Sequence, residues 1–424
     1  MCFCRRYMAR SQGIEGHCSH TSRVRRRARI PALLALFVTM SCCGSSVSTR
    51  VPSISRSAGG AKSTASTTTA ASTSTTGPQC ANATDLGTWG VPLLAAQMVA
   101  TAALLSDPAG ADAQVSEGAG GVVLMGSSTS ADLGAQLRAM AASNPGGVAP
   151  LLMTDEEGGA VQRLVAQVGS IPSARQMAAT MSAAQVRQLG STIGTKMASL
   201  SIKADLAPVL DLDAGPGPSA TNPDGTRSFS LDPAVAGEYG SAFAQGLESA
   251  GVIPVAKHFP GLGGASGNTD VAPAHTLPYS ELQKAGLLPF ERLIHEGVPA
   301  IMISNATVPG LSDTVPASLS SQVITGLLRQ RLGFSGVVIT DSLEAGAITA
   351  YQPDLAKAAV QSLQAGADMV MLAGTGPGQA QVFGQVVQAI SSAINTGTLP
   401  RIFAEYSVRR ILEMKGVPAA CISL

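Results

Sequence analysis

Charged and aromatic residues are both scarce in this chain of 424 residues, at 13% and 4% of the sequence. So little charge excludes a highly charged, wholly disordered protein. Hydrophobic residues make up 45%, which is enough for a sizeable core. The length suits either two ordinary domains or one large barrel, because a single α/β barrel takes about 250 residues or more.

The sequence also lacks the motifs of several common chemistries. It contains no HExxH, paired CxxC or EF-hand spacing, no Walker loop and no GxSxG elbow. Only three histidines, His258, His275 and His295, occur after residue 79. These absences disfavour a built-in metal and a nucleotide site. We therefore expect that the protein needs neither a metal nor a cofactor.

The net charge of +1 conceals an uneven distribution. Residues 1–79 contain 11 Lys and Arg against a single acid, Glu15, whereas residues 80–424 contain 17 basic and 26 acidic residues. The larger part of the chain is therefore acidic and has no cluster of Lys and Arg. Nucleic-acid binding requires a basic surface that neutralises phosphates, so we expect no nucleic-acid partner.

Residues 1–44 resemble an export signal. Five arginines within residues 23–29 precede an apolar run over residues 30–40. This run is too short to span the roughly 30 Å of hydrocarbon in a bilayer. Cys42, which follows Thr-Met-Ser, resembles the lipidated cysteine of a bacterial lipobox. The sequence predicts an exported protein that faces outside and is anchored to the membrane through Cys42, with a cleaved, secreted form as the alternative.

Residues 45–79 form a segment of low complexity. Eighteen of these 35 residues are Ser or Thr, none is acidic, and no hydrophobic periodicity is present that could build a core. The composition predicts a disordered tether between the export signal and one folded domain over residues 80–424.

Most of the cysteines lie near the N-terminus. Five of the seven occur at or before Cys43, which leaves Cys80 and Cys421 at the two ends of the predicted domain. Two such thiols would pair in an oxidising exterior. We predict a disulfide that joins the ends of the domain, with two free thiols as the alternative.

Within residues 80–424, short apolar runs alternate with longer Ala-rich segments of helical spacing. Continuous apolar runs are typical of parallel strands buried on both faces, and this alternation favours a single (β/α)8 barrel of the TIM type over an open sheet. Helices are expected at Ala183–Leu200, Pro233–Ala250, Ser320–Leu332 and Leu355–Gly366. Seven strands are expected, and no distinct run marks the eighth. They are Gly121–Met125, Pro150–Thr154, Ala204–Leu210, Val252–Phe259, Ala300–Ser304, Gly336–Thr340 and Met369–Ala373.

Polar residues stand at the ends of five of these strands. They are Asp155, Asp211, Lys257 with His258, Asn305 and Asp341. Any one Asp in such a place could simply cap the next helix. However, the carboxyl ends of barrel strands meet at one mouth, where barrel active sites lie. We therefore predict that these side chains form a shared site.

Four segments resemble, in the same order, the motifs of family 3 glycoside hydrolases. They are Asp155–Arg163, Arg227–Phe229, Lys257–Gly261 and Gly336–Leu343, and the resemblance to the bacterial β-N-acetylhexosaminidases of this family covers about residues 90–415. It implies a retaining exo-hydrolase of terminal β-linked sugars, with N-acetylglucosamine from cell-wall peptidoglycan fragments as the expected product.

The resemblance also implies roles for individual residues. Retaining hydrolysis needs a carboxylate that attacks the anomeric carbon, and a second group that protonates the leaving oxygen. Asp341 matches the nucleophile of the family, which forms the covalent glycosyl intermediate. The positions that match sugar-binding residues are Asp155, Arg163, Arg227, Lys257 and His258.

The acid/base loop departs from the family pattern. The hexosaminidase branch carries Asp-Ser/Thr-His here, in which His transfers the proton and Asp orients it, whereas this chain has Asn268-Thr269-Asp270. Asp270 can act as the acid/base if its surroundings raise its pKa, and His275 is the weaker candidate. A site without a competent acid stays open as a third possibility.

This departure leaves two alternatives to a hexosaminidase. One is a non-catalytic, sugar-binding lipoprotein on a decayed hydrolase barrel. The other is a β-glucosidase or β-xylosidase of the same family, because the sequence does not reveal which side chain faces the 2-substituent of the sugar. The sequence gives no indication of the oligomeric state.

Overall fold

The computed structural model describes residues 80, 84–143 and 147–424. The predicted export signal over residues 1–44, the tether over residues 45–79 and the lipidation site Cys42 all lie outside the described residues. Within the described ranges, no helix combines the length and the apolar character needed to cross a bilayer.

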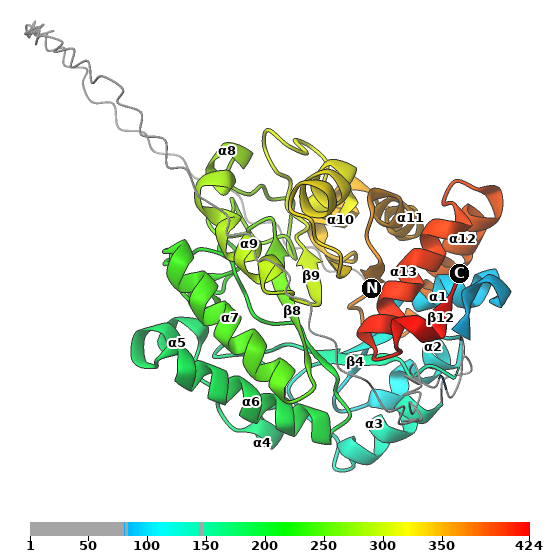
Figure 1. The fold of residues 1–424 in the computed structure, drawn as a ribbon, viewed down its shortest axis with the longest axis horizontal. Coiled ribbons are helices and arrows are strands. Elements are labelled where there is room, and N and C mark those ends of the chain that lie inside the picture. The colour runs from blue at the N-terminus through cyan, green and yellow to red at the C-terminus, as the bar shows by residue number, and fades with distance from the viewer. Residues whose placement is uncertain (1–79, 81–83, 144–146) are drawn as a thin grey trace, which may run out of the picture. The chain divides into compact units, whose positions relative to one another are not determined.

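Eight parallel strands close into a barrel, with helices packed around it (Figure 1). The first and last strands of the barrel meet where Val370 pairs with Val99. This closed arrangement confirms the (β/α)8 barrel predicted from the sequence. In chain order the strands are β2 (Val99–Leu104), β3 (Gly121–Met125), β4 (Leu151–Thr154), β7 (Ala204–Asp205), β8 (Ile253–Phe259), β9 (Ala300–Ile303), β10 (Val337–Ser342) and β11 (Met369–Met371).

The strand that had no distinct run in the sequence is β2. Its sequence is Val-Ala-Thr-Ala-Ala-Leu, and it follows helix α1 (Val91–Gln97) after a single residue. Alanine has little preference for strands, so the segment is hard to distinguish from the end of an Ala-containing helix. Five of its six residues are nevertheless buried. Its position in the barrel, rather than its composition, makes it a strand.

Strand β7 is shorter than the predicted run Ala204–Leu210, because the regular strand ends at Asp205. Pro208 follows, and it has no backbone N–H to donate to a neighbouring strand. Beyond it, Val209 forms only an isolated bridge with Lys257. The prediction was therefore right about the position of the strand and wrong about its length.

The four predicted helices are all present, with ends within two residues of those expected. They are α6 (Ala183–Ser199), α7 (Pro233–Ser249), the π-helical segment η6 (Gln322–Arg331) and α11 (Leu355–Ala365). Helices α6 and α7 lie against each other through glycines. A Cβ atom on Gly246 would lie 2.3 Å from the carbonyl oxygen of Arg187. Only glycine permits this close approach.

The other helices and the strands outside the barrel complete the described fold. The helices are α2 (Asp112–Ser116), α3 (Leu133–Ala142), α4 (Val165–Val168), α5 (Ala174–Thr180), α8 (Tyr279–Glu281), α9 (Leu288–His295), α10 (Gly346–Tyr351), α12 (Gln379–Thr396) and α13 (Arg401–Met414). Strands β5 (Glu156–Gly158) and β6 (Val161–Gln162) form a small antiparallel pair, and β1 (Thr84–Asp85) pairs with β12 (Ile422–Ser423).

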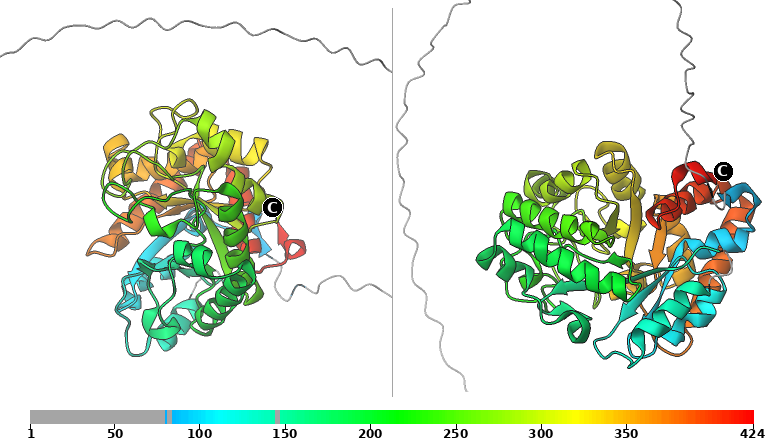
Figure 2. Two further views of the ribbon diagram at one scale, coloured as in Figure 1. Left: turned by 90° about the vertical axis from the view of Figure 1, so that its left-hand side faces the viewer. Right: turned by 60° about the horizontal axis from the view of Figure 1, so that its bottom comes forward.

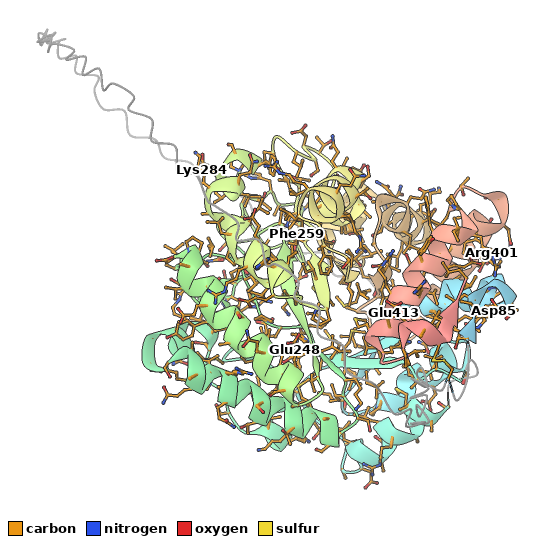
Figure 3. The ribbon with its side chains drawn as sticks, in the orientation of Figure 1. Asp85, Glu248, Phe259, Lys284, Arg401 and Glu413 are labelled. Atoms are coloured by element: carbon orange, nitrogen blue, oxygen red, sulfur yellow. A yellow bond between two sulfur atoms is a disulfide. The ribbon has the colours of Figure 1, made fainter. Side chains whose placement is uncertain are left out.

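The two ends of the described domain are joined. Cys80 and Cys421 form the disulfide that was predicted, with 5.5 Å between their Cα atoms. Strands β1 and β12 pair in parallel beside it, which brings the C-terminus next to the start of the domain (Figure 2). Arg401 donates hydrogen bonds to the carbonyl oxygens of Leu86, Gly87 and Trp89, close to Asp85 (Figure 3). The fold is therefore closed by covalent and polar contacts between its first and last segments.

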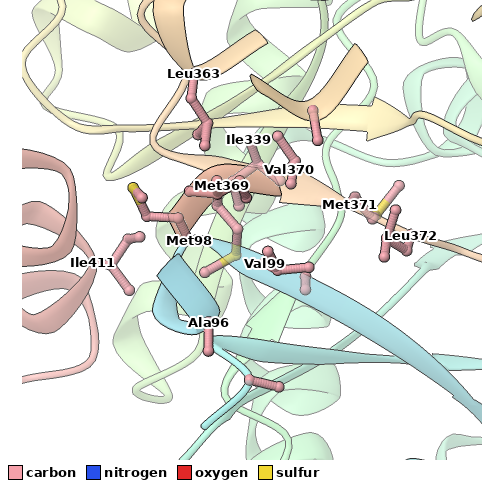
Figure 4. Close-up of a cluster of buried hydrophobic side chains, with 14 of the residues drawn as sticks. Ala96, Met98, Val99, Ile339, Leu363, Met369, Val370, Met371, Leu372 and Ile411 are labelled. Carbon is pink, nitrogen blue, oxygen red and sulfur yellow. The ribbon is translucent and has the colours of Figure 1, made fainter. Parts of the chain in front are cut away.

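A buried apolar cluster holds the strands in place (Figure 4). Met98 and Val99 pack with Met369 and Val370 of β11, and Ile411 of α13 belongs to the same cluster. Each such side chain contributes roughly 1.5–3 kcal/mol through burial. A packed barrel of this kind fixes the strand ends, and therefore the polar side chains that they carry.

Candidate active site

A cavity of about 190 Å³ lies at the carboxyl ends of the barrel strands. Apolar side chains such as Val123, Leu206, Met302 and Met371 contribute to its lining. The polar side chains that line it are Asp155, Arg163, Arg227, Lys257, His258, Asn268, Thr269, Asp270, Asp341 and Ser342. The structure thus brings together every predicted catalytic and sugar-binding residue except His275.

Asp341 lies near the end of β10 and is half-buried. Its Oδ1 atom accepts a hydrogen bond from the backbone N–H of Ser342. Helix α10 has Ala345 as its N-cap, so Asp341 does not cap the next helix. Burial raises the pKa of Asp341, and the neighbouring Asp270 carboxylate raises it further. The side chain is free to meet a ligand in the cavity.

Asn305, which was expected at the mouth, supports the end of β10 instead. Its Nδ2 atom donates to the carbonyl oxygen of Ser342 at 2.6 Å, and its Oδ1 atom accepts from the Ser318 hydroxyl. The side chain is almost completely buried. Because both of its polar ends are occupied, Asn305 holds the segment that carries Asp341.

Lys257 and Glu157 form the centre of a buried ionic network. The Lys257 Nζ atom lies 2.6 Å from both the Asp155 and the Glu157 carboxylates. Arg227 donates two hydrogen bonds of 2.8 Å to the two oxygens of Glu157. Burial opposes the ionisation of Glu157, but the charges of Arg227 and Lys257 outweigh it and lower its pKa to about 2. Glu157 is therefore a permanent anion that positions both cations.

The sequence did not single out Glu157 as a site residue. The available signal was that Glu157 stands two residues after Asp155, because residues two apart in a strand point to the same face. The acid between them, Glu156, points to the other face and has different surroundings. Glu156 shows this difference. Its carboxylate accepts hydrogen bonds from the backbone N–H groups of Arg163 and Leu164, and so it holds the turn rather than a ligand.

Arg163 reaches the cavity from this turn. Its guanidinium lies 3.9 Å from the Asp155 carboxylate, and the Arg side chain is more exposed than any other cation of the network. Gly158, with φ of +90°, allows the turn to form, because a Cβ atom there would lie 2.3 Å from the carbonyl oxygen of Pro172. Arg163 is thus held at the mouth and Lys257 deeper inside.

His258 is a neutral imidazole in this site. Burial lowers its pKa to about 4, and the charge of Arg227 adds to this effect. Its Nδ1 atom lies 2.6 Å from the Asp211 carboxylate, and its Nε2 atom lies 3.5 Å from Arg227. These partners assign the proton to Nδ1. Asp211, which was expected at the mouth, is instead fully buried and orients the His258 ring through this hydrogen bond.

The loop after β8 places Asp270 in the cavity. The carbonyl oxygens of Thr269 and Asp270 accept hydrogen bonds from the backbone N–H groups of Ala347 and Gly346, so the loop docks on the start of α10. Asn268 accepts from the backbone N–H of Asp270 at 2.9 Å. Asn268 therefore shapes the backbone of the turn, and the Asp270 side chain is exposed and borders the cavity.

His275 points elsewhere. It is exposed, and its Nδ1 atom lies 3.0 Å from the carbonyl oxygen of Thr276. It does not belong to the lining of the cavity. Of the two acid/base candidates, the structure brings only Asp270 to the same cavity as Asp341.

Among the described residues, one group of side chains has the geometric reach to hold a metal ion. Its members are Asp211, Asp224 and His258, with one ligand atom of each within 4.8 Å of the others. Two of the three already hydrogen bond to each other at 2.6 Å.

Paired carboxylates beside buried cations, in one cavity at the mouth of a (β/α)8 barrel, are the groups that glycoside hydrolysis requires. Residues 106–414 match the Glycosyl hydrolase family 3 N terminal domain. The chain belongs to glycosyl hydrolase family 3 and is an O-glycosyl hydrolase. This confirms both the family and the class of enzyme that the four sequence motifs predicted.

Several relatives are similar over most of the chain. The β-hexosaminidase LpqI of Mycobacterium tuberculosis is 36% identical over 345 residues, which cover 78% of this chain and 86% of that protein. A solved structure of LpqI superimposes with a TM-score of 0.71 at 32% identity, over 79% of this chain and 97% of LpqI. The β-N-acetylhexosaminidase structure from Beutenbergia cavernae gives a TM-score of 0.69 at 28% identity, over 78% and 99% of the two chains.

A fungal relative has a name that says that it is secreted. It is an uncharacterized secreted glycosyl hydrolase of Arthroderma benhamiae, 34% identical over 269 residues. The match covers 62% of this chain and 74% of the fungal protein.

Proposed function

We propose that this protein is a retaining exo-β-N-acetylhexosaminidase that releases terminal N-acetylglucosamine from cell-wall peptidoglycan fragments. The observation that carries the proposal is that Asp341 and Asp270 line one cavity together with Asp155, Arg227 and Lys257. The relatives named β-hexosaminidase support the choice of sugar.

In the first chemical step, the Asp341 carboxylate attacks the anomeric carbon and a covalent glycosyl-Asp341 intermediate forms. The bond from that carbon to the leaving oxygen breaks as protonated Asp270 donates its proton to this oxygen. In the second step, ionised Asp270 accepts a proton from water, which attacks the same carbon and releases Asp341. Two displacements at one carbon return the sugar with its original anomeric configuration.

The cations and Asp155 hold the sugar during both steps. Lys257 can donate three hydrogen bonds, and Asp155 and Glu157 engage two of them. One N–H therefore stays available for a sugar hydroxyl, with Arg163 and Arg227 as further donors at the cavity wall. Charge-assisted hydrogen bonds contribute about 1.5–3 kcal/mol each, which is enough to orient one ring.

The shape of the cavity supports release of terminal sugars. Val123, Leu206, Met302 and Met371 are barrel side chains that contribute to its lining, and all but Met371 are at most 2% exposed. Because the barrel interior is filled by such side chains, a glycan enters from the strand ends and presents its terminal ring.

We also infer that the protein is exported and attached to a membrane through a lipid on Cys42. The basic and apolar pattern of residues 1–44, the Cys80–Cys421 disulfide and the secreted fungal relative support export. Metabolic labelling with a fatty acid tests the anchor. The label should be lost in Cys42→Ser and kept in the matched control Cys43→Ser, and labelled Cys42→Ser protein would contradict the assignment.

The test of the proposed function is hydrolysis of an aryl β-N-acetylglucosaminide by the wild type and by Asp341→Asn. We expect turnover with a retained anomer in the wild type, and a loss of roughly 10⁴-fold in the variant. Equal rates would contradict the assigned nucleophile. Aryl β-glucosides and β-xylosides separate the related substrate classes. Calorimetric binding of the amino sugar without any product would identify a non-catalytic sugar-binding protein.

A further inference from the structure

Asp224 is a buried carboxyl group that neither the ionic network nor the two chemical steps explain. Its side chain is completely buried, and no N–H or O–H group donates to either of its oxygens. Asp224 directly precedes the short helix η3 (Gly225–Arg227), which ends at the sugar-binding Arg227. The backbone N–H of Arg227 donates to the carbonyl oxygen of Asp224. A contact that fixes the position of Asp224 therefore also fixes the position of Arg227.

The neighbour of Asp224 is Asp211, since one carboxylate oxygen of each lies within 4.8 Å of the other. Asp211 already has its own hydrogen-bond donors. Asp211 accepts hydrogen bonds from the backbone N–H of Leu262 at 2.6 Å, from the backbone N–H of His258 at 3.1 Å and from His258 Nδ1 at 2.6 Å. Such a set of donors stabilises an anion. An ionised Asp224 would be a second buried anion beside it, with no donor of its own, which is strongly unfavourable.

We propose that Asp224 is a neutral carboxylic acid, that its hydroxyl donates a hydrogen bond to Asp211, and that this bond positions His258 and Arg227. The effect on sugar binding rests on the proposed function, whereas the protonation of Asp224 does not. Asp224 is then a positioning residue that connects the loop before α7 to the end of β8 through Asp211.

The electrostatic surroundings agree with this assignment. Burial raises the pKa of Asp224 well above its usual range, and the charge of Asp211 raises it further. The other charged or titratable groups that face Asp224 are Arg227, which lowers its pKa, Asp213, which raises it, and His258, which lowers it only when its ring is charged. Burial raises the pKa of Asp211 to about 7. Because Asp211 accepts three hydrogen bonds and Asp224 accepts none, the proton of the pair belongs to Asp224.

A divalent cation fits this group of side chains less well than a proton does. His258 Nδ1 and Asp211 Oδ2 are hydrogen-bonded to each other at 2.6 Å, and His258 Nε2 lies 3.5 Å from the Arg227 guanidinium. Both nitrogens are therefore already engaged, and one of them faces a permanent positive charge.

The direct test is an infrared difference spectrum of the full-length protein at pH 7, in the region of the protonated carboxyl C=O stretch. Burial also raises the pKa of Asp205, so the band of Asp224 must be isolated by subtraction of the Asp224→Asn spectrum. We expect a positive band in wild type minus Asp224→Asn. The matched control Asp232→Asn, which keeps an N-cap residue at α7, should give none. A flat difference for Asp224→Asn would overturn the proposal.

Kinetics with an aryl β-N-acetylglucosaminide test the positioning role. Asn keeps an N–H donor for Asp211, so the KM of Asp224→Asn should stay within about threefold of the wild-type value. Asp224→Leu has no donor and should raise KM about tenfold or more, with a smaller effect on kcat. An equal rise in KM in both variants would overturn the proposal. So would a stoichiometric divalent metal that is found in the wild type and lost in Asp224→Asn. If even the wild type shows no turnover, the proposed function fails while the infrared result still decides the state of Asp224.

Discussion

The Lys257 ammonium group lies 2.6 Å from the Glu157 carboxylate, and neither side chain is more than 3% exposed. The same nitrogen lies 2.6 Å from Asp155, so one cation inside the cavity pairs with two acids. Removal of one partner from a buried ion pair leaves the other charge uncompensated. The stability of the barrel and the proposed binding of sugar therefore depend on the same side chain.

Replacement of Lys257 by Met should lower the free energy of unfolding by about 3–5 kcal/mol, because Asp155 and Glu157 lose their common cation. Urea denaturation measures this change. Lys284→Met is the matched control, since the Lys284–Glu281 pair is 68% and 51% exposed. An exposed pair of this kind contributes less than about 1 kcal/mol. Equal changes in the two variants would show that the buried network does not stabilise the fold.

The pairing of Glu157 predicts a specific dependence of stability on pH. Its pKa is lowered from 4.5 to about 2 in the folded protein, so its stabilising contribution is complete above pH 4.5 and is lost as the pH falls toward 2. The gap in unfolding free energy between wild type and Glu157→Gln should therefore narrow by about 2 kcal/mol between pH 5 and pH 3. A gap that stays constant over this range would mean that Glu157 is not a paired anion.

Asp270 and His275 can be separated as acid/base by their sensitivity to the leaving group. Asp270→Asn should reduce kcat/KM about 10²–10⁴-fold on an N-acetylglucosamine disaccharide, and much less on an aryl glycoside whose leaving group needs no proton. His275→Ala is the matched control and should retain the wild-type rate on both substrates, because its side chain lies outside the cavity lining. The reverse pattern would assign the proton transfer to His275.

The terminal disulfide should stabilise the folded domain. Cys80 and Cys421 are 341 residues apart in the sequence, so their bond restricts the unfolded chain over almost the whole domain. Cys421→Ser should lower the free energy of unfolding by about 2–4 kcal/mol. Reduction of the wild type with dithiothreitol should give the same loss, and should leave Cys421→Ser unchanged. Unequal losses would indicate a strain introduced by the serine itself.

The prediction of the barrel succeeded where strands consist of large apolar residues. Val-Val-Leu-Met in β3 and Val-Val-Ile-Thr in β10 are recognisable because strands buried on both faces need such side chains. Strand β2 was missed because four of its six residues are Ala or Thr and it follows an Ala-containing helix. The run of β7 was predicted too long because Pro208 interrupts the regular pairing that its apolar neighbours suggest.

The sequence alone determined four of the polar residues that meet at the mouth, since each stands at the end of a strand and parallel strands end at one edge. It therefore indicated Asp155, Lys257, His258 and Asp341 without any coordinates. Which partner each side chain takes was decided only by the tertiary structure. Glu157 bonds Arg227 across 70 residues, and Lys257 meets Asp155 across 102. Docking of a loop on α10 directs Asp270 into the cavity and leaves His275 outside. The physical reason is that strand ends follow from local hydrophobic pattern, whereas hydrogen bonds and pKa values depend on groups that only folding brings within a few ångströms.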